Sequence, residues 1–319
     1  MATIDVVIPV YRPDEKLDRL IRKLYCQTVL PHAVILMVTV TGGEKELPQI
    51  SGRAAAAARG TKGEGRVSLV LRGLGKEEFS HGRTRNQGIA LSEADYVVCM
   101  TQDAVPKDRF LLERLLSAFS RYPRVSSAYA RQTAGAQAPE LVRMTQSFNY
   151  PAEEQVKNRC TYGKLGIKNI FCSDVCCMYD RSVFVSLGGF VDRVIFNEDM
   201  LYARKAIDAG YQVVYAAGAA VEHWHDYTLS QQFRRNFDLA VSQKEHPEAF
   251  ADLSSEAEGV RMVKRVLGIL YRKGRWGQML RYVLLSGAKY LGYRAGLCYR
   301  RLPLWLVKRC SMTPGYFKE

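Results

Sequence analysis

The 319-residue chain lacks the features that would place it across a membrane or outside the cell. It has no run of about 18 apolar residues, so the sequence predicts no membrane-spanning helix. Neither a basic nor an apolar segment precedes its first expected strand, so we expect no signal peptide. Eight cysteines without such a signal are typical of reduced thiols in a cytoplasmic protein. Cys160, Cys172, Cys176 and Cys177 lack paired CxxC spacing, which argues against zinc.

Acidic residues are nearly absent from the C-terminal region. Residues 261–319 hold 14 Lys and Arg residues and one acidic residue, whereas residues 1–260 hold 32 basic and 31 acidic residues. The net charge of +14 is therefore almost wholly C-terminal. Such a region attracts phosphates of lipid headgroups or nucleic acids. No nucleic-acid-binding motif accompanies it, so we expect no nucleic-acid partner.

From residue 258 onward the sequence is helical, basic and aromatic. One helical stripe comprises Trp276, Leu280, Val283, Leu284, Gly287 and Leu291. A basic amphipathic helix rich in Trp and Tyr suits a membrane interface. A helical cap packed on the preceding domain is the alternative, and association between copies of the chain is also open. We therefore divide the chain into a domain at 1–257 and a membrane-associating helical region at 258–319.

Alternating strand and helix patterns predict an α/β fold for the first domain. Runs rich in β-branched residues at 4–11, 34–41 and 67–71 predict strands covered on both faces. The helices expected between them imply a parallel sheet with right-handed crossovers. Residues 132–170 are polar and irregular, and so long a loop in a compact domain is usually functional or mobile. A further strand is expected at 170–179.

Asp103 follows the apolar run 96–100 directly, at the end of an expected strand. Ligands of open α/β sheets bind at the carboxyl ends of strands, so Asp103 is a candidate to hold a metal or a phosphate-bearing ligand. His223 and His225 follow another strand, at 213–221, and would face the same side of an extended chain. They are candidate metal ligands; a pair of surface or stacking histidines is the alternative.

Two helix starts carry charged residues. Arg83, Arg85 and the backbone N–H groups at the start of a helix over 84–92 could face an anion, or the segment could be a solvated loop with Asn86 in a turn. Glu198 and Asp199 begin a helix ending near residue 209, where carboxylates complement the helix dipole. Adjacent residues do not share a helix face, so at most one of the two should point into a cleft.

Taken together, these segments resemble the GT-A glycosyltransferases of family 2, and within them the bacterial rhamnosyltransferase-like branch. The resemblance covers residues 4–230. It is carried by ordered motifs at 6–11, 79–88, 101–106, 131–132, 149–151, 197–199 and 223–227. It implies the GT-A fold, with a Rossmann-like, mostly parallel central sheet flanked by helices, followed here by the basic amphipathic C-terminal helices.

The resemblance also implies an activity. An inverting enzyme would move a rhamnose-like sugar from a dTDP- or UDP-sugar donor to a hydroxyl of a lipid-linked glycan acceptor in bacterial cell-surface polysaccharide synthesis. It would act in the cytoplasm, peripherally on the inner face of the cytoplasmic membrane. Mn²⁺ or Mg²⁺ would be held by Asp103 with His223 or His225. Asp199 matches the family's catalytic base, and Glu198 would orient the acceptor.

Ligand-binding residues follow from the same resemblance. For the nucleotide-sugar they are Pro9, Val10, Tyr11, Thr39, Thr41, His81, Arg85, Asn86, Gln102 and Asp103. For the acceptor they are Arg131, Asn149, Tyr150, Asp174 and Asn197. Two positions depart from the family pattern. Gln102-Asp103 stands where two aspartates are usual, and the second strand ends without the usual Asp, so Thr39 or Thr41 would replace it in part.

Two other functions fit parts of the sequence. A non-catalytic GT-A-fold scaffold of a membrane-associated glycan assembly complex would carry the same basic region. Metal-dependent hydrolysis of the donor would distinguish an enzyme from such a scaffold. A metal-dependent phosphodiesterase or nuclease would need more clustered carboxylates than Asp103 and Asp199 provide.

Overall fold

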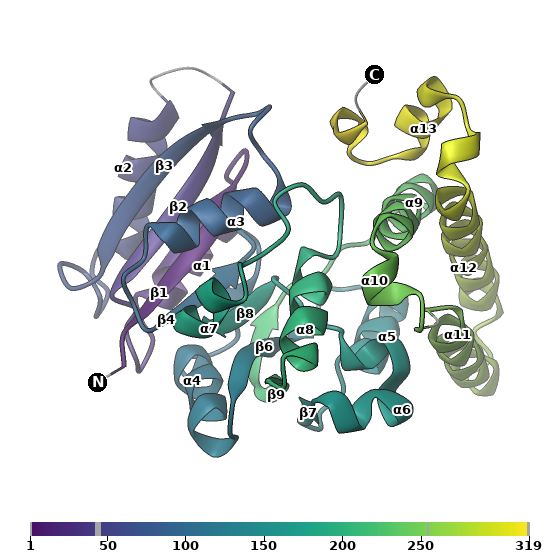
Figure 1. The fold of residues 1–319 in the computed structure, drawn as a ribbon, viewed down its shortest axis with the longest axis horizontal. Helices are drawn as coiled ribbons and strands as arrows, with labels where there is room; N and C mark the ends of the chain where they lie inside the picture. The colour runs from purple at the N-terminus through teal and green to yellow at the C-terminus, as the bar shows by residue number, and fades with distance from the viewer. Residues whose placement is uncertain (1, 42–45, 254, 318–319) are drawn as a thin grey trace.

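The computed structural model describes residues 2–41, 46–253 and 255–317. Within these residues one nine-stranded sheet runs in the order β3-β2-β1-β4-β8-β6-β9-β5, and β7 pairs with β9 (Figure 1). Helices cover both faces of this sheet, and further helices lie beyond its β9 side. The predicted α/β fold with a central sheet flanked by helices is confirmed.

The N-terminal half of the sheet is parallel, as the order of its elements predicts. Its strands are β1 (Ile4–Val10), β2 (Ala33–Val40), β3 (Ser68–Gly75) and β4 (Tyr96–Met100). β1 lies between β2 and β4 and runs parallel to both. The side chains of β1 and β2 are almost all buried, because helices cover both faces of the sheet here. This burial explains why both strands are nearly continuous runs of apolar residues.

Helices that connect these strands sit on opposite faces. α1 (Glu15–Leu24), α2 (Glu46–Ala58) and α4 (Leu111–Arg121) share one core with one face of the sheet, while α3 (His81–Ala90), α7 (Arg181–Ser186) and α8 (Glu198–Asp208) pack on the other. Gly82 lets α3 approach the segment before α8 closely. A Cβ at Gly82 would lie 2.0 Å from the carbonyl oxygen of Val191. α3 and α8, far apart in sequence, therefore meet on one face.

The C-terminal half of the sheet is mixed, which differs from a mostly parallel arrangement. Its strands are β5 (Val105–Pro106), β6 (Val125–Thr133), β7 (Gln155–Lys157), β8 (Cys176–Asp180) and β9 (Gln212–Glu222). β6 and β9 are parallel, but β8 is antiparallel to both β4 and β6. β8 begins beside the carboxyl end of β4, where Cys176 pairs with Met100, and it therefore runs in the opposite direction to β4 and β6.

The segment predicted to be an irregular loop at 132–170 is largely structured. It contains α5 (Glu140–Asn149), β7, η1 (Arg159–Thr161), α6 (Tyr162–Leu165) and η2 (Gly166–Asn169). The prediction missed α5, in which polar residues outnumber apolar ones and Leu141 is the one buried residue. The strand predicted at 170–179 starts only at Cys176, and residues 171–175 form a wall of the cavity described below.

The C-terminal helices pack beside the sheet domain. They are α9 (Leu229–Glu245), α10 (Pro247–Phe250), α11 (Ser255–Arg272), α12 (Trp276–Leu297), η3 (Tyr299–Arg301), α13 (Leu304–Cys310) and η4 (Pro314–Tyr316). α12 runs along α9 (Figure 1) and contacts it through Gly292 and Gly296. A Cβ at Gly292 would lie 2.1 Å from the carbonyl oxygen of Phe233, so the two helices approach backbone to backbone. The domain boundary predicted after residue 257 falls inside α11 and stays a prediction.

The stripe predicted on the C-terminal helix is exposed. Trp276 and Leu280 are each 63% exposed, and the other stripe residues also face solvent, whereas Tyr282, Gly292 and Gly296 of the same helix are buried. Among the described residues, none of the helices combines the length and the apolar content needed to cross a bilayer. One side of α12 thus packs against α9, and the opposite side exposes an apolar stripe to solvent.

Candidate functional site

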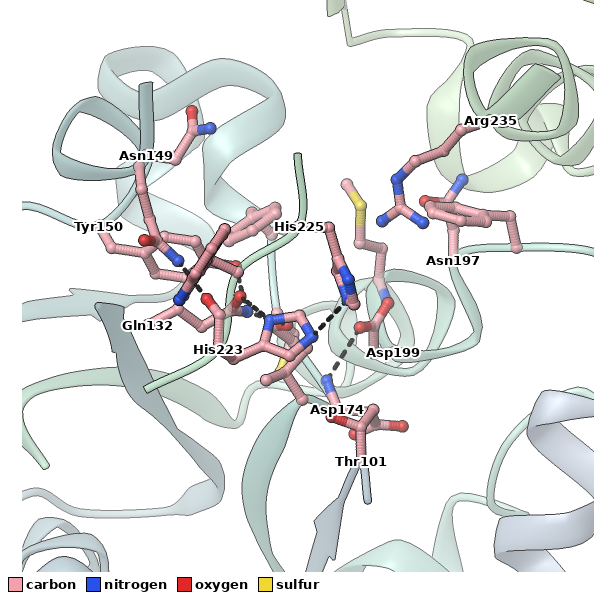
Figure 2. A pocket seen from close by; sticks show the side chains of 18 of the residues that line it. Thr101, Gln132, Asn149, Tyr150, Asp174, Asn197, Asp199, His223, His225 and Arg235 are labelled. Atoms are coloured by element: carbon pink, nitrogen blue, oxygen red, sulfur yellow. Dashed lines mark hydrogen bonds between the residues drawn. The ribbon is translucent and has the colours of Figure 1, made fainter. Parts of the chain in front are cut away.

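A cavity of about 440 Å³ opens at the sheet edge where β4, β6 and β9 end (Figure 2). Its walls come from α3, the loop after β4, the end of β6, α5, residues 171–175, the start of α8, and the segment from the end of β9 into α9. Of the candidate residues, the cavity is lined by His81, Arg85, Asp103, Asn149, Tyr150, Asp174, Asn197, Glu198, Asp199, His223 and His225. Carboxyl ends of strands therefore form the site, as the position of Asp103 suggested.

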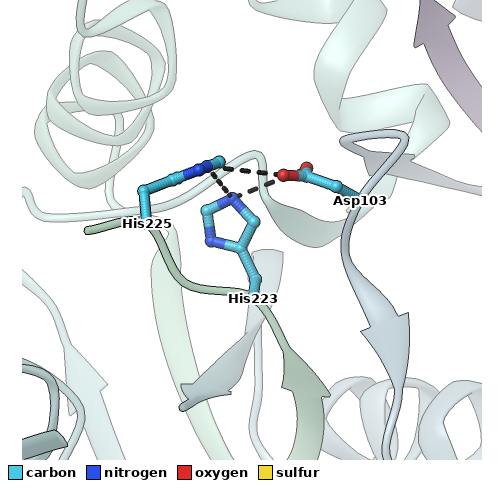
Figure 3. A group of neighbouring side chains, drawn as sticks. All are labelled: Asp103, His223 and His225. Carbon is cyan, nitrogen blue, oxygen red and sulfur yellow. Dashed lines mark hydrogen bonds and ion pairs between the residues drawn. The ribbon is translucent and has the colours of Figure 1, made fainter. Parts of the chain in front are cut away.

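The structure brings the three candidate metal ligands together (Figure 3). Asp103 Oδ1 lies 3.6 Å from His223 Nε2, and Asp103 Oδ2 lies 3.4 Å from His225 Nε2. The two histidine Nε2 atoms are 3.1 Å apart. The antiparallel pairing of β5 with β9, with Val105 opposite Glu222, holds the Asp103 loop beside the histidines. The candidate metal ligands thus come from two chain segments about 120 residues apart, and the pairing of β5 with β9 brings these segments together.

Hydrogen bonds around Gln132 set the tautomer of His223. The side-chain nitrogen of Gln132 donates to Tyr150 Oη (2.5 Å) and Ser173 Oγ (2.9 Å), which leaves its oxygen to accept from His223 Nδ1 at 2.9 Å. With its proton on Nδ1, His223 presents a lone pair on Nε2 toward Asp103. A second hydrogen bond of this kind commonly orients metal-binding histidines.

Both imidazoles are neutral near pH 7. Burial lowers the pKa of His223 to about 4, although Asp103 opposes this shift. Burial also lowers the pKa of His225. Neutral imidazole is the form that binds metals, and two imidazole nitrogens with one carboxylate suit a divalent transition ion. The donor set therefore fits Mn²⁺ better than Mg²⁺, which prefers all-oxygen ligands.

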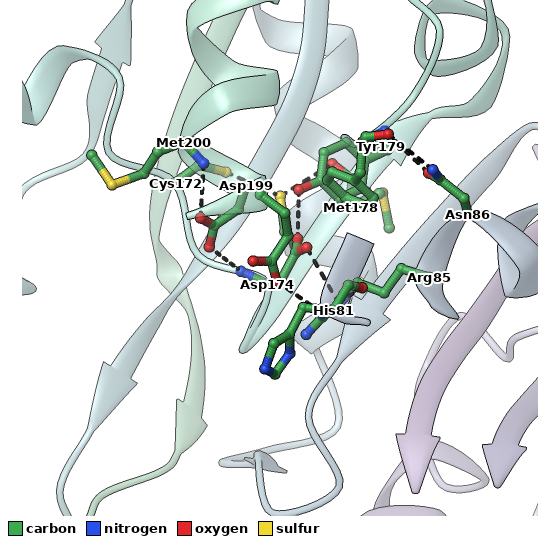
Figure 4. Close-up of polar contacts among 12 residues, drawn as sticks. His81, Arg85, Asn86, Cys172, Asp174, Met178, Tyr179, Asp199 and Met200 are labelled. Carbon is green, nitrogen blue, oxygen red and sulfur yellow. Dashed lines mark hydrogen bonds and ion pairs between the residues drawn. The ribbon is translucent and has the colours of Figure 1, made fainter. Parts of the chain in front are cut away.

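A buried ion-pair network lies beneath the cavity (Figure 4). Arg85 Nη1 donates to Glu198 Oε1 at 2.8 Å, and Arg85 Nε lies 3.3 Å from Asp174 Oδ2. All three residues are buried. Burial raises the pKa of Asp174 to about 6, against the opposing charge of Arg85. Because two carboxylates already compensate Arg85, its contacts do not support the predicted role of pairing with donor phosphate.

Asp199 is the carboxylate at the cavity surface. It is half-buried, and its two oxygens accept from the backbone nitrogens of Met200 (2.7 Å) and Asp174 (3.1 Å). Burial, together with Glu198 and Asp174, raises the pKa of Asp199 well above its ordinary range. Both Glu198 and Asp199 line the cavity, contrary to the expectation that only one would, but Glu198 is held by Arg85. Asp199 is therefore the carboxylate free to meet a ligand.

Asn197 precedes α8 in a left-handed backbone conformation, with φ of 68°. Its buried side-chain nitrogen has no hydrogen-bond partner among the residues that the structure describes. This donor lines the cavity next to Asp199, so it can bind a ligand oxygen.

The remaining candidate residues do not line this cavity. They are Pro9, Val10, Tyr11, Thr39, Thr41, Asn86, Gln102 and Arg131. Gln102 connects the two regions, because its side chain accepts from the backbone nitrogen of Tyr11 (2.8 Å) and donates to the carbonyl of Tyr11 (3.0 Å). The ends of β1 and of the Asp103 loop are thereby held together.

Two of these residues have other surroundings. The side chain of Asn86 donates to Phe190 O and Asp192 Oδ1 and accepts from Phe190 N, so its amide holds the segment before α8. Arg131 lies next to Gln132 on β6, and neighbouring strand residues point to opposite faces. Gln132 therefore faces the cavity and Arg131 does not.

Two polar residues of the site were not among the predicted site residues: Gln132, which lies in the motif at 131–132, and Arg235. Arg235 of α9 lines the cavity, with its guanidinium 4.6 Å from the ring of Phe196 and 5.6 Å from that of Tyr227. Nothing in the sequence distinguishes it from Arg234, which is exposed. Only the orientation of α9 about its axis places Arg235, and not Arg234, in the cavity wall.

Comparisons with known proteins were made on the sequence and on the fold. A model of the family described as "Glycosyl transferase family 2" matches residues 5–188. The O-antigen chain rhamnosyltransferase WbaN of Salmonella anatum is 37% identical over 248 residues, which cover 77% of this chain and 78% of WbaN. The O-antigen chain rhamnosyltransferase RfbN of Salmonella typhimurium is 32% identical over 318 residues, which cover 99% of this chain and 96% of RfbN.

Solved structures resemble the fold at low sequence identity. A mannosyltransferase from Pyrobaculum calidifontis, in complex with GDP-Man and Mn²⁺, superposes with a TM-score of 0.57 at 15% identity, covering 91% of this chain and 87% of that one. S. aureus TarS, residues 1–349, gives a TM-score of 0.50 at 13% identity, covering 94% and 91%. These neighbours are GT-A glycosyltransferases, so the likeness shows the GT-A fold.

Proposed function

Because this chain belongs to glycosyl transferase family 2, we propose that it transfers a rhamnose-like sugar from a dTDP- or UDP-sugar to a hydroxyl of a glycan acceptor in cell-surface polysaccharide synthesis. The observation that carries the proposal is the shared cavity. Asp103, His223 and His225 stand at one part of it, and Asp199 at another. A donor diphosphate and an acceptor hydroxyl would thus meet in one cavity.

In the proposed reaction the acceptor hydroxyl hydrogen-bonds to Asp199, which takes its proton as the oxygen attacks the anomeric carbon. A raised pKa makes this carboxylate a stronger base than an exposed aspartate. Attack opposite the leaving nucleoside diphosphate inverts the anomeric centre. Asn197 would orient the acceptor through its unpaired amide nitrogen, and Arg85 would fix Glu198 and Asp174 around the base.

The donor is proposed to lie across the Tyr11–Gln102 junction, with its nucleotide toward Pro9, Val10 and Thr39 and its diphosphate toward Asp103. Asp103, His223 and His225 would hold Mn²⁺, which when bound neutralises charge on the diphosphate as a Lewis acid. The chain's own part is to keep both imidazoles neutral and His223 fixed by Gln132.

Mn²⁺ binding and donor turnover test this function together. The purified chain should bind Mn²⁺ and slowly hydrolyse a dTDP- or UDP-sugar, since water can replace the acceptor. Asp103→Asn and His225→Ala should each weaken Mn²⁺ binding by on the order of 10–100-fold, because each removes a ligand. Titration calorimetry with Mn²⁺ measures this directly, and His246→Ala, a histidine paired with Glu248 outside the cavity, is the control. Mn²⁺ binding without any donor turnover or transfer would favour the scaffold protein instead.

We also propose that the exposed stripe of α12 binds the anionic inner face of the cytoplasmic membrane. A lipid-linked acceptor would reach the enzyme there. The stripe holds Trp276 and Leu280, and Arg272, Lys273 and Arg275 precede it, all exposed. Apolar side chains beside cations match the headgroup boundary of an anionic bilayer.

Vesicle binding measures this contact. The double variant Trp276→Ser/Leu280→Ser should bind phosphatidylglycerol-containing vesicles at least about tenfold more weakly, since two large side chains no longer leave water. Leu91→Ser, at an exposed leucine on the sheet domain, should bind like the wild type. Co-sedimentation with the vesicles gives the readout. Self-association through the stripe without vesicle binding would instead make it an interface between copies of the chain.

A further inference from the structure

A second, smaller recess adjoins the catalytic cavity. Its volume is about 70 Å³, and it shares Val142, Thr145, His225 and Tyr227 with the larger cavity. Its far wall is α12, which contributes Arg281 and Lys289. The two spaces therefore lie next to each other at Tyr227, and α12 forms a wall at this end of the site.

Two cations at this junction form no ion pair with any residue that the structure describes. Lys289 is half-buried and forms no hydrogen bond with any of these residues either. The guanidinium of Arg235 lies against the rings of Phe196 and Tyr227, and its nearby acidic residue, Asp238 of the same helix, interacts with it electrostatically without pairing with it. Arg281 differs, because Asp226 accepts from it at 3.1 and 3.0 Å.

The environment of Lys289 disfavours its charge. Burial and the nearby Arg235 lower the pKa of Lys289. Lys289 in the recess and Arg235 in the adjoining cavity are partly desolvated cations that repel each other, which costs free energy, and an anion bound between them relieves that cost. Arg offers a planar fork and Lys a point charge, and both are common ligands of phosphate oxygens.

The position of the two cations favours the acceptor over the donor. Figure 2 shows Arg235 on the side of Asn197 and Asp199, where the proposed acceptor hydroxyl lies. Lys289 lies farther away, on α12, whose outer side carries the exposed apolar stripe. A ligand anchored in a membrane under that stripe would pass Lys289 before it reaches Asp199.

We propose that Arg235 and Lys289 form a binding site for a phosphate or diphosphate group carried by the acceptor. This inference rests on the proposed function and deepens it. Because the recess and the cavity share His225 and Tyr227 as walls, a short saccharide would separate the anionic group from the reacting hydroxyl. The chain would then act early, on an acceptor with few sugars between its diphosphate and its free end.

Inorganic pyrophosphate in the presence of EDTA is the probe, since removal of divalent ions eliminates binding through Asp103 and the histidines. By titration calorimetry, Lys289→Met and Arg235→Gln should each weaken pyrophosphate binding at least about tenfold, because each removes a charged hydrogen-bond donor. Lys289→Arg should retain it. Lys264→Met, at an exposed lysine on α11, makes the same change of charge outside both cavities and should bind like the wild type. Thermal unfolding of each variant shows that it is folded.

Three results would overturn the inference: no pyrophosphate binding by the wild type without metal, equal binding by Lys289→Met, or binding that needs Mn²⁺ and Asp103. The last would assign the cations to the donor's diphosphate. Failure of the proposed function looks different. A chain that binds pyrophosphate through Lys289 but turns over no nucleotide sugar with Mn²⁺ would keep the anion site and lose the transferase.

Discussion

Asp199→Asn is expected to abolish sugar transfer while leaving Mn²⁺ and donor binding nearly intact. The substitution keeps the shape of the side chain but removes the base, and positioned base catalysis is worth on the order of 10²–10⁴-fold. Transfer to an acceptor is the measurement. Asp208→Asn, at the other end of α8, where the carboxylate pairs with Arg204, is the matched control. Transfer at the wild-type rate by Asp199→Asn would exclude Asp199 as the base.

The same variant should be at least as stable as the wild type at neutral pH. The pKa of Asp199 is raised in the folded chain by burial, Glu198 and Asp174, so its ionised form destabilises the fold. That cost is absent below the pKa of the unfolded chain and grows as pH rises through the folded pKa. The melting temperature of Asp199→Asn should therefore exceed that of the wild type by more at pH 7.5 than at pH 4.

The pH profile of transfer tests how the network tunes the base. Transfer requires ionised Asp199, so activity should rise with pH through a pKa above that of an ordinary aspartate. Glu198→Gln removes a negative neighbour and frees Arg85 from one partner. Both changes favour the ionised base, so the acid limb of kcat/KM should move to lower pH. An unchanged or upward-shifted limb would contradict this coupling.

Arg85→Met is expected to have the largest effect on stability. It leaves Glu198 and Asp174 buried without their counterion, and breaking a buried ion pair from one side typically costs about 3–5 kcal/mol. Urea unfolding measures the loss. Because Arg85 opposes the rise in the pKa of Asp174, its removal raises that pKa further, and the loss should grow as pH rises above the unfolded value of this carboxyl.

Two comparisons isolate the ion pair. Arg83→Met, on the exposed side of the same helix, should change the free energy of unfolding by less than about 0.5 kcal/mol. The double variant Arg85→Met/Glu198→Gln should recover part of the stability, because one of the stranded carboxylates is neutral. A loss no larger for Arg85→Met than for Arg83→Met would show that the network does not stabilise the fold.

Local patterns determined the parallel half of the sheet. β1 and β2 are buried on both faces, and Leu17, Leu20 and Leu24 of α1 form one buried stripe, so their periodicity identified strands and a helix. The order of these elements then predicts parallel pairing. The polar α5 and the reversal of β8 could not be predicted in this way, because few apolar residues mark α5 and pairing between distant strands decides the direction of β8.

The sequence by itself identified the candidate residues for the chemistry: a carboxylate at a strand end, two histidines at strand spacing, and Glu198-Asp199 at a helix start. Only the tertiary structure decided how they combine. The pairing of β5 with β9 brings Asp103 to His223, and the packing of α3 and α8 on one face gives Arg85 to Glu198 and Asp174 rather than to a phosphate. The placement of α9 and α12 puts Arg235 in the cavity and Lys289 in the adjoining recess, where neither forms an ion pair with a described residue. Each outcome depends on contacts between residues far apart along the chain, which local spacing does not encode.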